Sequence, residues 1–134
     1  KTREETPEIV EQVFSRLLIS SFSPKALYLV RAAFPEVNLA YLAEIKDWDT
    51  EWVLRKEKIK EDMSVLGCVS LNLNQDVFAL DQKETRLAEI KEVAGSALLL
   101  AYTVNDPARA EELRTEFGLS GVFTDQLIQE AFLM

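Results

Sequence analysis

The sequence predicts an α/β protein built from parallel β/α repeats. Five short apolar runs recur about every 21 to 30 residues, and a segment of helical character fills each gap. The clearest example is 98–125, where an apolar run, a helix and a second apolar run fit into about 28 residues, the length of one parallel βαβ unit. No Pro-, Gly- or Ser-rich linker interrupts the chain, so we expect residues 1–134 to form a single unit.

The expected strands are short and mostly apolar, as in a parallel sheet that helices cover. The first of them, Leu18–Phe22, is predicted to be buried. Together the expected strands cover 18–22, 39–43, 67–74, 98–104 and 121–124.

Several of the expected helices begin with a capping side chain followed by proline. Thr6-Pro7, Ser23-Pro24 and Asp106-Pro107 have this form, in which the side-chain oxygen accepts a free backbone N–H and proline suits the first turn. Proline or glycine marks the ends. The expected helices start at Pro7, run from Pro24 to before Pro35, end near Met63 in a charged segment, and cover 81–94, 107–117 and 126–134.

Composition excludes several classes of partner. The net charge is −8, whereas nucleic acids and anionic membranes attract clustered positive charge. The basic residues of 55–60 alternate with Glu57, Glu61 and Asp62, which predicts a solvated helix face. No apolar run reaches the roughly 18 residues of a membrane span.

A cytoplasmic location is expected, because no targeting peptide is visible. The chain starts at Lys1 rather than Met, so we expect the natural N-terminus to lie outside it. The single cysteine, Cys68, excludes an intrachain disulfide and is predicted to be a buried, unreactive thiol.

Polar residues alternate along the third expected strand. Ser70, Asn72 and Asn74 share one face, and Leu71 and Leu73 share the other. Three polar side chains in a dry core are costly, so the pattern predicts a polar cavity for a hydroxylated or phosphorylated ligand. The alternative is capping of the strand end by Asn74 and an internal hydrogen bond from Ser70.

The chain contains no histidine, which excludes a Ser-His-Asp triad and histidine-based metal sites. Its glycines form no phosphate-binding loop. Glu44 and Asp47 could pair as acid and base, but they are interpreted as surface charges, and Asp106 and Asp125 as helix caps. Trp48 and Trp52, one turn apart, are interpreted as a packing pair rather than a ligand platform. None of these patterns predicts a catalytic site or a metal site.

Four short motifs, in order and at matching spacing, resemble one enzyme family. They are Ser20-Ser21-Phe22, Leu66 to Ser70 with Asn74, Tyr102 to Asn105, and Phe123 to Asp125. From Pro7 onward, the chain resembles the C-terminal half of a bacterial glycerophosphodiester phosphodiesterase. The resemblance implies a TIM (β/α)8 barrel, of which these would be strands four to eight.

The resemblance also implies a reaction. The complete enzymes use a divalent cation, Mg²⁺ or Ca²⁺, to hydrolyse glycerophosphodiesters to glycerol 3-phosphate and an alcohol. Their histidine pair and metal-binding carboxylates lie on the first three strands, which are absent here. The isolated chain is therefore expected to be inactive, and to bind the missing N-terminal half or itself through its open sheet edges.

The resemblance implies that this chain contributes residues that line one side, or wall, of the substrate site. Phe22 would line the glycerol or alcohol side, Asn74 would face the barrel mouth, and Tyr102, where relatives often have Trp, would lie beside the substrate. Asn72 stands where similar sequences can carry His, so no role is assigned to it.

Two alternatives remain open. One is a non-enzymatic half-barrel module for binding or assembly. The other is a self-contained doubly wound domain, which would require Ser70, Asn72 and Asn74 to be hydrogen-bonded internally.

Overall fold

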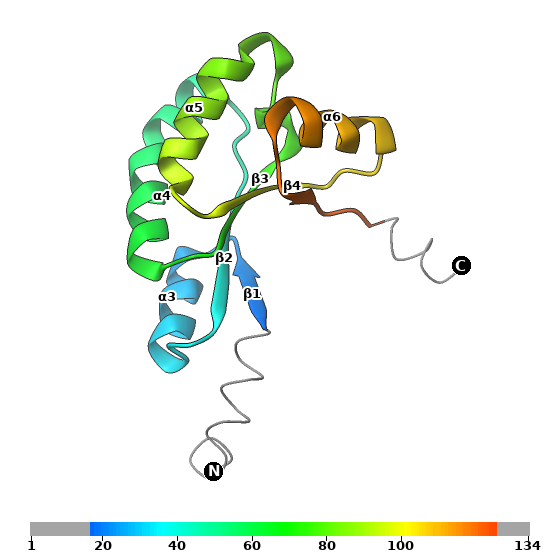
Figure 1. The fold of residues 1–134 in the computed structure, drawn as a ribbon. Coiled ribbons are helices and arrows are strands. Elements are labelled where there is room, and N and C mark those ends of the chain that lie inside the picture. The colour runs from blue at the N-terminus through cyan, green and yellow to red at the C-terminus, as the bar shows by residue number, and fades with distance from the viewer. Residues whose placement is uncertain (1–16, 126–134) are drawn as a thin grey trace, which may run out of the picture.

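A computed structural model describes residues 17–125 as one parallel sheet with helices along one side (Figure 1). The sheet has five strands, and each pairs with the next one along the chain in the order β1-β2-β3-β4-β5. All four pairings are parallel, which confirms the predicted fold class. The strands are β1 (Leu18–Ser21), β2 (Asn38–Ala43), β3 (Ser70–Asn74), β4 (Leu98–Tyr102) and β5 (Gly121–Val122).

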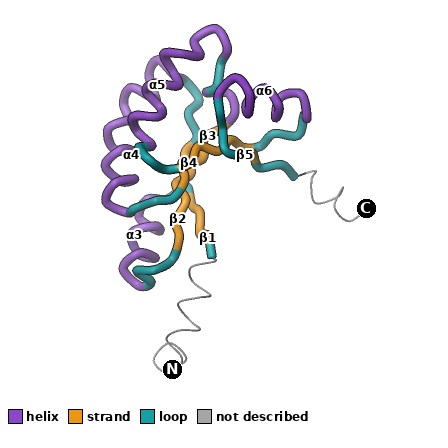
Figure 2. The backbone as a smooth tube through the Cα atoms, in the orientation of Figure 1, coloured by secondary structure: helices purple, strands orange, loops and turns teal. Residues whose placement is uncertain are grey.

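The helices between the strands follow one another along the same side of the curved sheet (Figure 2). A doubly wound sheet would instead reverse its strand order and carry helices on both faces. The observed order is that of a barrel wall. The α-helices are α3 (Pro24–Ala33), α4 (Val53–Leu66), α5 (Lys83–Ala94) and α6 (Pro107–Phe117).

Local signals position two of these helices as predicted. Ser23 Oγ accepts the Ala26 N–H at 3.2 Å, and Asp106 Oδ1 accepts the Ala108 N–H at 3.0 Å. Gly67, with φ 64°, ends α4 in the left-handed conformation that glycine adopts without strain. The helices expected to start at Pro7 and to cover 126–134 lie outside the described residues.

Several boundaries differ from the sequence prediction. Helix α4 continues past Met63 to Leu66, and β3 starts at Ser70 rather than Gly67. The reason is that the left-handed turn falls at Gly67, so the chain needs two more residues to enter the sheet. Strands β4 and β5 end early, at Tyr102 and Val122.

Large aromatic side chains fill the space between helices and sheet. Phe78 and Phe117 are almost completely buried and meet edge to face, with ring centroids 5.5 Å apart. Trp48 stacks on the buried Trp52 at 4.8 Å, and the Arg86 guanidinium lies 4.8 Å from the Trp48 ring. Protein side chains therefore occupy both sides of the Trp48 ring, which confirms the packing interpretation. Both tryptophans lie in a short π-helical turn, Trp48–Trp52.

One residue of the charged helix contradicts the prediction of a solvated face. Asp62 is fully buried and accepts hydrogen bonds from Tyr28 Oη and Tyr41 Oη, each at 2.8 Å, and from Lys58 Nζ at 2.9 Å. Helical periodicity turns position 62 toward β2, whereas Glu61 points outward. Burial raises the Asp62 pKa, but the three donors outweigh it and hold the pKa below its usual value. Asp62 ties α3, α4 and β2 together.

The opposite, concave face of the sheet is exposed at its margins, whereas β3 at its centre is buried on both faces. The side chains at these margins include Leu18, Phe22 and Leu98, which are 48%, 56% and 52% exposed. The prediction that Leu18–Phe22 is a buried strand is therefore wrong for residues 17–125, because β1 has no neighbour on its outer edge and no layer above its concave face. No helix in this part of the chain is long and apolar enough to cross a membrane.

Candidate functional site

The candidate site is the edge of the sheet where the parallel strands end. Ser21, Ala43, Asn74 and Tyr102 are the last residues of β1 to β4. In singly wound parallel folds, the loops that leave this edge carry the functional residues. The structure thus places all three predicted substrate residues, Phe22, Asn74 and Tyr102, at one edge.

Phe22 and Tyr102 form an aromatic pair across this edge. Their rings meet edge to face, with centroids 5.7 Å apart and an interplanar angle of 86°. Tyr102 Oη donates to the carbonyl oxygen of Ala43 at 3.0 Å, which fixes the ring above β3. Burial, with a smaller effect of Glu44, raises the Tyr102 pKa to about 12, so the phenol stays protonated and neutral near pH 7. The pair therefore offers an apolar, uncharged surface at the mouth.

Asn74 has both ends of its amide engaged by the backbone. Its Oδ1 accepts the Ile45 N–H at 2.7 Å, and its Nδ2 donates to the Ile45 carbonyl at 2.8 Å. Asn74 thus fixes the loop that follows β2, as the capping alternative expects. Its contact with a substrate remains a prediction.

Ser70 and Asn72, on the same face of β3, behave differently. Both are buried, and within residues 17–125 neither Ser70 Oγ nor either amide atom of Asn72 has a hydrogen-bond partner. The expectation of an internal hydrogen bond from Ser70 is therefore not met in this part of the chain. A self-contained doubly wound domain, which requires these groups to be satisfied internally, is disfavoured.

Sequence reasoning missed Arg109 on α6, which bonds to the loop after β3 at the site edge. Its Nε donates to Gln75 Oε1 at 3.1 Å, and its Nη2 donates to the carbonyls of Gln75 and Phe78 at 2.8 Å each. Gln75 Nε2 in turn donates to the Thr103 carbonyl at 2.7 Å. These partners lie about 30 residues apart in sequence, so no local pattern reveals them.

The last two family-like motifs also meet at this edge. Asn105 Oδ1 accepts the Thr124 hydroxyl at 2.6 Å and the Asp125 N–H at 3.2 Å. These bonds hold the loop after β4 beside the chain that leaves β5. The helix that Asp125 was predicted to cap lies outside the described residues.

Comparison with known proteins identifies the family. The chain matches the glycerophosphoryl diester phosphodiesterase family over residues 4–129. The chain belongs to this family. No curated protein matches.

Solved structures of phosphodiesterases are similar to this chain. One from Oleispira antarctica, in complex with the product sn-glycerol-3-phosphate, is 28% identical, with a TM-score of 0.56 over 99% of this chain and 51% of that one. A glycerophosphodiester phosphodiesterase from Thermotoga maritima is 24% identical, with a TM-score of 0.58 over 100% of this chain and 55% of that one. A third, from Silicibacter pomeroyi, is 21% identical, with a TM-score of 0.62 over 85% of this chain and 36% of that one. The chain thus spans about half the length of the first two, consistent with the predicted partial barrel.

A divalent cation, which the family implies, does not fit the described residues by themselves. Residues 17–125 contain no group of three or more His, Cys, Asp or Glu side chains that could hold a metal ion. At the site edge, Asn74 Oδ1 is already used by the Ile45 N–H. Phe22 and Tyr102 offer no anionic oxygen near neutral pH. The metal ligands of a family active site would have to come from outside these residues.

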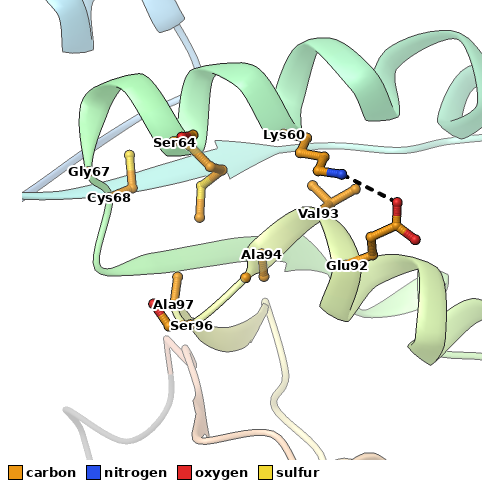
Figure 3. Close-up of a pocket in the computed structure, with 11 residues that line it drawn as sticks. Lys60, Ser64, Gly67, Cys68, Glu92, Val93, Ala94, Ser96 and Ala97 are labelled. Atoms are coloured by element: carbon orange, nitrogen blue, oxygen red, sulfur yellow. Dashed lines mark hydrogen bonds and ion pairs between the residues drawn. The ribbon is translucent and has the colours of Figure 1, made fainter.

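A pocket of about 470 Å³ lies at the opposite edge, between the C-terminal ends of α4 and α5 (Figure 3). Lys60 and Glu92 form an ion pair of 3.4 Å there, and Cys68 lies on its wall. Cys68 is buried, as predicted, and this burial raises its pKa to about 11. Its low reactivity stays a prediction. In family barrels this edge serves stability rather than chemistry.

Proposed function

We propose that this chain supplies the C-terminal β/α units, strands four to eight, of a glycerophosphodiester phosphodiesterase barrel. The observation that carries the proposal is the five-stranded parallel sheet in chain order, with Phe22 and Tyr102 paired at its carboxyl edge. Family membership over residues 4–129 and the coverage of about half of the similar phosphodiesterases support it.

In the complete site, the aromatic pair forms a wall rather than the catalytic centre. The Phe22 ring, 56% exposed, packs against the carbon chain of the glycerol or the alcohol. The hydrogen bond from the Tyr102 hydroxyl to Ala43 fixes the Tyr102 ring, and in this position the ring lies beside the substrate. Asn74 shapes the mouth by holding the loop at Ile45.

The chain by itself is inactive under this proposal. Hydrolysis of a phosphodiester requires an acid for the departing alkoxide, a base for water, and a cation that stabilises the phosphoryl charge. The sequence has no histidine, and residues 17–125 offer no carboxylate cluster for Mg²⁺ or Ca²⁺. These groups belong to the part of the barrel that the chain lacks.

The test compares residues 1–134 with a chimera. In the chimera, the part of the Oleispira antarctica phosphodiesterase that this chain does not cover precedes Lys1. We expect release of glycerol 3-phosphate from a panel of glycerophosphodiesters, with Mg²⁺ or Ca²⁺, only by the chimera. Turnover by the 134-residue chain, or a folded chimera without turnover, refutes the proposal.

A matched pair of variants locates the substrate wall. In the chimera, Phe22→Ala should raise KM by about tenfold, because it removes apolar contact with the substrate. The control is Leu29→Ala, which truncates a 64% exposed side chain on α3, away from the strand ends. Equal KM values for the two variants contradict the role of Phe22.

The open sheet also supports a second candidate function, a non-enzymatic half-barrel that binds or assembles with a partner. Strands β1 and β5 each lack a neighbour on one side within residues 17–125, and the concave face exposes Leu18, Phe22 and Leu98. Unpaired edges and exposed apolar side chains favour association with the missing half or a second copy. Sedimentation at micromolar concentration tests this: a clean monomer counts against association.

A further inference from the structure

A buried polar pair in the middle of the concave face has no role in the wall described above. We propose that Ser70 and Asn72 form an internal binding site for an uncharged side chain that carries both a hydrogen-bond donor and an acceptor. The side chain comes from the β/α units that complete the barrel. This inference rests on the proposed function, since it names what those units must bring.

Asn72 and Asn74 share a strand and a face, but their environments differ. Asn74 makes two hydrogen bonds with Ile45, at 2.7 Å and 2.8 Å. Asn72 is 0% exposed and, within residues 17–125, both its Oδ1 and its Nδ2 are unpartnered. Ser70 Oγ, two residues earlier, is 2% exposed and also unpartnered there.

The register of the sheet gives the direction of these side chains. Tyr41 reaches Asp62 of α4, so it points to the helix side, and its register partner Leu71 shares that side. Alternation along the strand therefore turns Ser70 and Asn72 to the concave side, where the missing strands would close the barrel.

The surroundings limit what can bind. The register partners of Asn72 are Leu42 on β2 and Leu100 on β4, so the amide lies in an apolar layer. A buried polar group without a partner destabilises a fold, and a buried unpaired charge does so far more. A carboxylate offers only acceptors and an ammonium only donors, so neither satisfies both ends of the amide. A carboxamide, a hydroxyl or a neutral imidazole satisfies both.

The experiment uses the same substitution at two positions in two proteins. Asn72→Leu and Asn74→Leu are made in residues 1–134 and in the chimera with the Oleispira phosphodiesterase segment, and urea unfolding is followed by circular dichroism. In the 134-residue chain, Asn74→Leu should lower the folding equilibrium constant by about tenfold or more, because it breaks two buried hydrogen bonds. Asn72→Leu should leave it unchanged or raise it.

In the chimera, Asn72→Leu and Asn74→Leu should lower the folding equilibrium constant by similar factors. Asn72→Leu should now lower the folding constant by about tenfold, because it leaves the incoming side chain without its partner. Ser70→Ala should act in the same direction, with Ser64→Ala, an exposed position on α4 away from the concave face, as its control.

The outcomes separate failure of this inference from failure of the proposed function. An Asn72→Leu loss in the 134-residue chain equal to that of Asn74→Leu overturns the inference, because the amide then has a partner inside the chain. A chimera that folds and hydrolyses substrate but tolerates Asn72→Leu overturns the inference alone. A chimera that does not fold as a monomer refutes the proposed function and the inference with it.

Discussion

Replacing Asp62 by alanine should destabilise the chain by about 2–4 kcal/mol. The carboxylate is fully buried and accepts hydrogen bonds from Tyr28, Tyr41 and Lys58. No other single side chain in residues 17–125 bonds to α3, β2 and α4 together in this way, so the substitution tests how the wall of the barrel is held.

The magnitude follows from what each donor loses. Tyr41 is 2% exposed, so its hydroxyl would be buried without a partner, at a cost of about 1–3 kcal/mol. The half-buried Tyr28 loses about 0.5–1.5 kcal/mol of net hydrogen bonding. Lys58 is 63% exposed and returns to water, so its loss adds little to the sum. Relief of the buried charge offsets part of this sum.

The assay is urea unfolding of residues 1–134, monitored by tryptophan fluorescence. The control is Glu61→Ala on the next position of α4, where the side chain is 69% exposed and lies 4.0 Å from Lys58. We expect the control to change stability by less than about 0.5 kcal/mol. If Asp62→Ala costs no more than the control, the geometry argued for this network is wrong.

Three further results are expected. The Asp62 pKa lies below its ordinary 3.8, so the network stabilises the fold above that pH, and this stability is lost as the pH falls through the lower folded value. In the wild type, the urea concentration at the unfolding midpoint should therefore fall once the pH is below about 4. In Asp62→Asn it should fall less. Tyr102→Phe keeps the ring against Phe22 but removes the hydrogen bond to Ala43, so unfolding should show a loss of about 1 kcal/mol, and no loss would contradict that bond. Cys68, with a pKa of about 11, should be about one part in a thousand thiolate at pH 8, so iodoacetamide should label it slowly until urea unfolds the chain, and fast labelling of the folded chain would contradict its burial.

The sequence predicted the repeat but not the environment of single residues. Capping pairs such as Ser23-Pro24 and Asp106-Pro107 act within one turn, so their helices start where the sequence indicates. Arg109 was not singled out, and Asp62 was wrongly assigned to a solvated face, because their partners are brought close only by folding. Arg109 bonds to residues 31 and 34 positions away, and Asp62 to one 34 positions away.

For the candidate site too, the sequence predicted which residues take part but not the environment of each. Strand periodicity and the family-like motifs identified Phe22, Asn74 and Tyr102, and the parallel register does bring them to one edge. The sequence offered a capping role for Asn74, but it could not show that Asn72, on the same face of the same strand, stays without a partner in residues 17–125. The difference arises because the loop at Ile45 reaches Asn74 and does not reach Asn72.

By itself, the sequence determined the parallel β/α order and the absence of histidine chemistry, because helix caps, apolar period and composition are local or global properties of the chain. Only the tertiary structure decided which polar groups are satisfied and which face of the sheet is left uncovered. Hydrogen bonds and burial depend on residues distant in sequence, so they exist only once the strands have taken their register. In this chain that register leaves an apolar concave face, with two unpaired polar side chains at its centre, in the part that the structure describes.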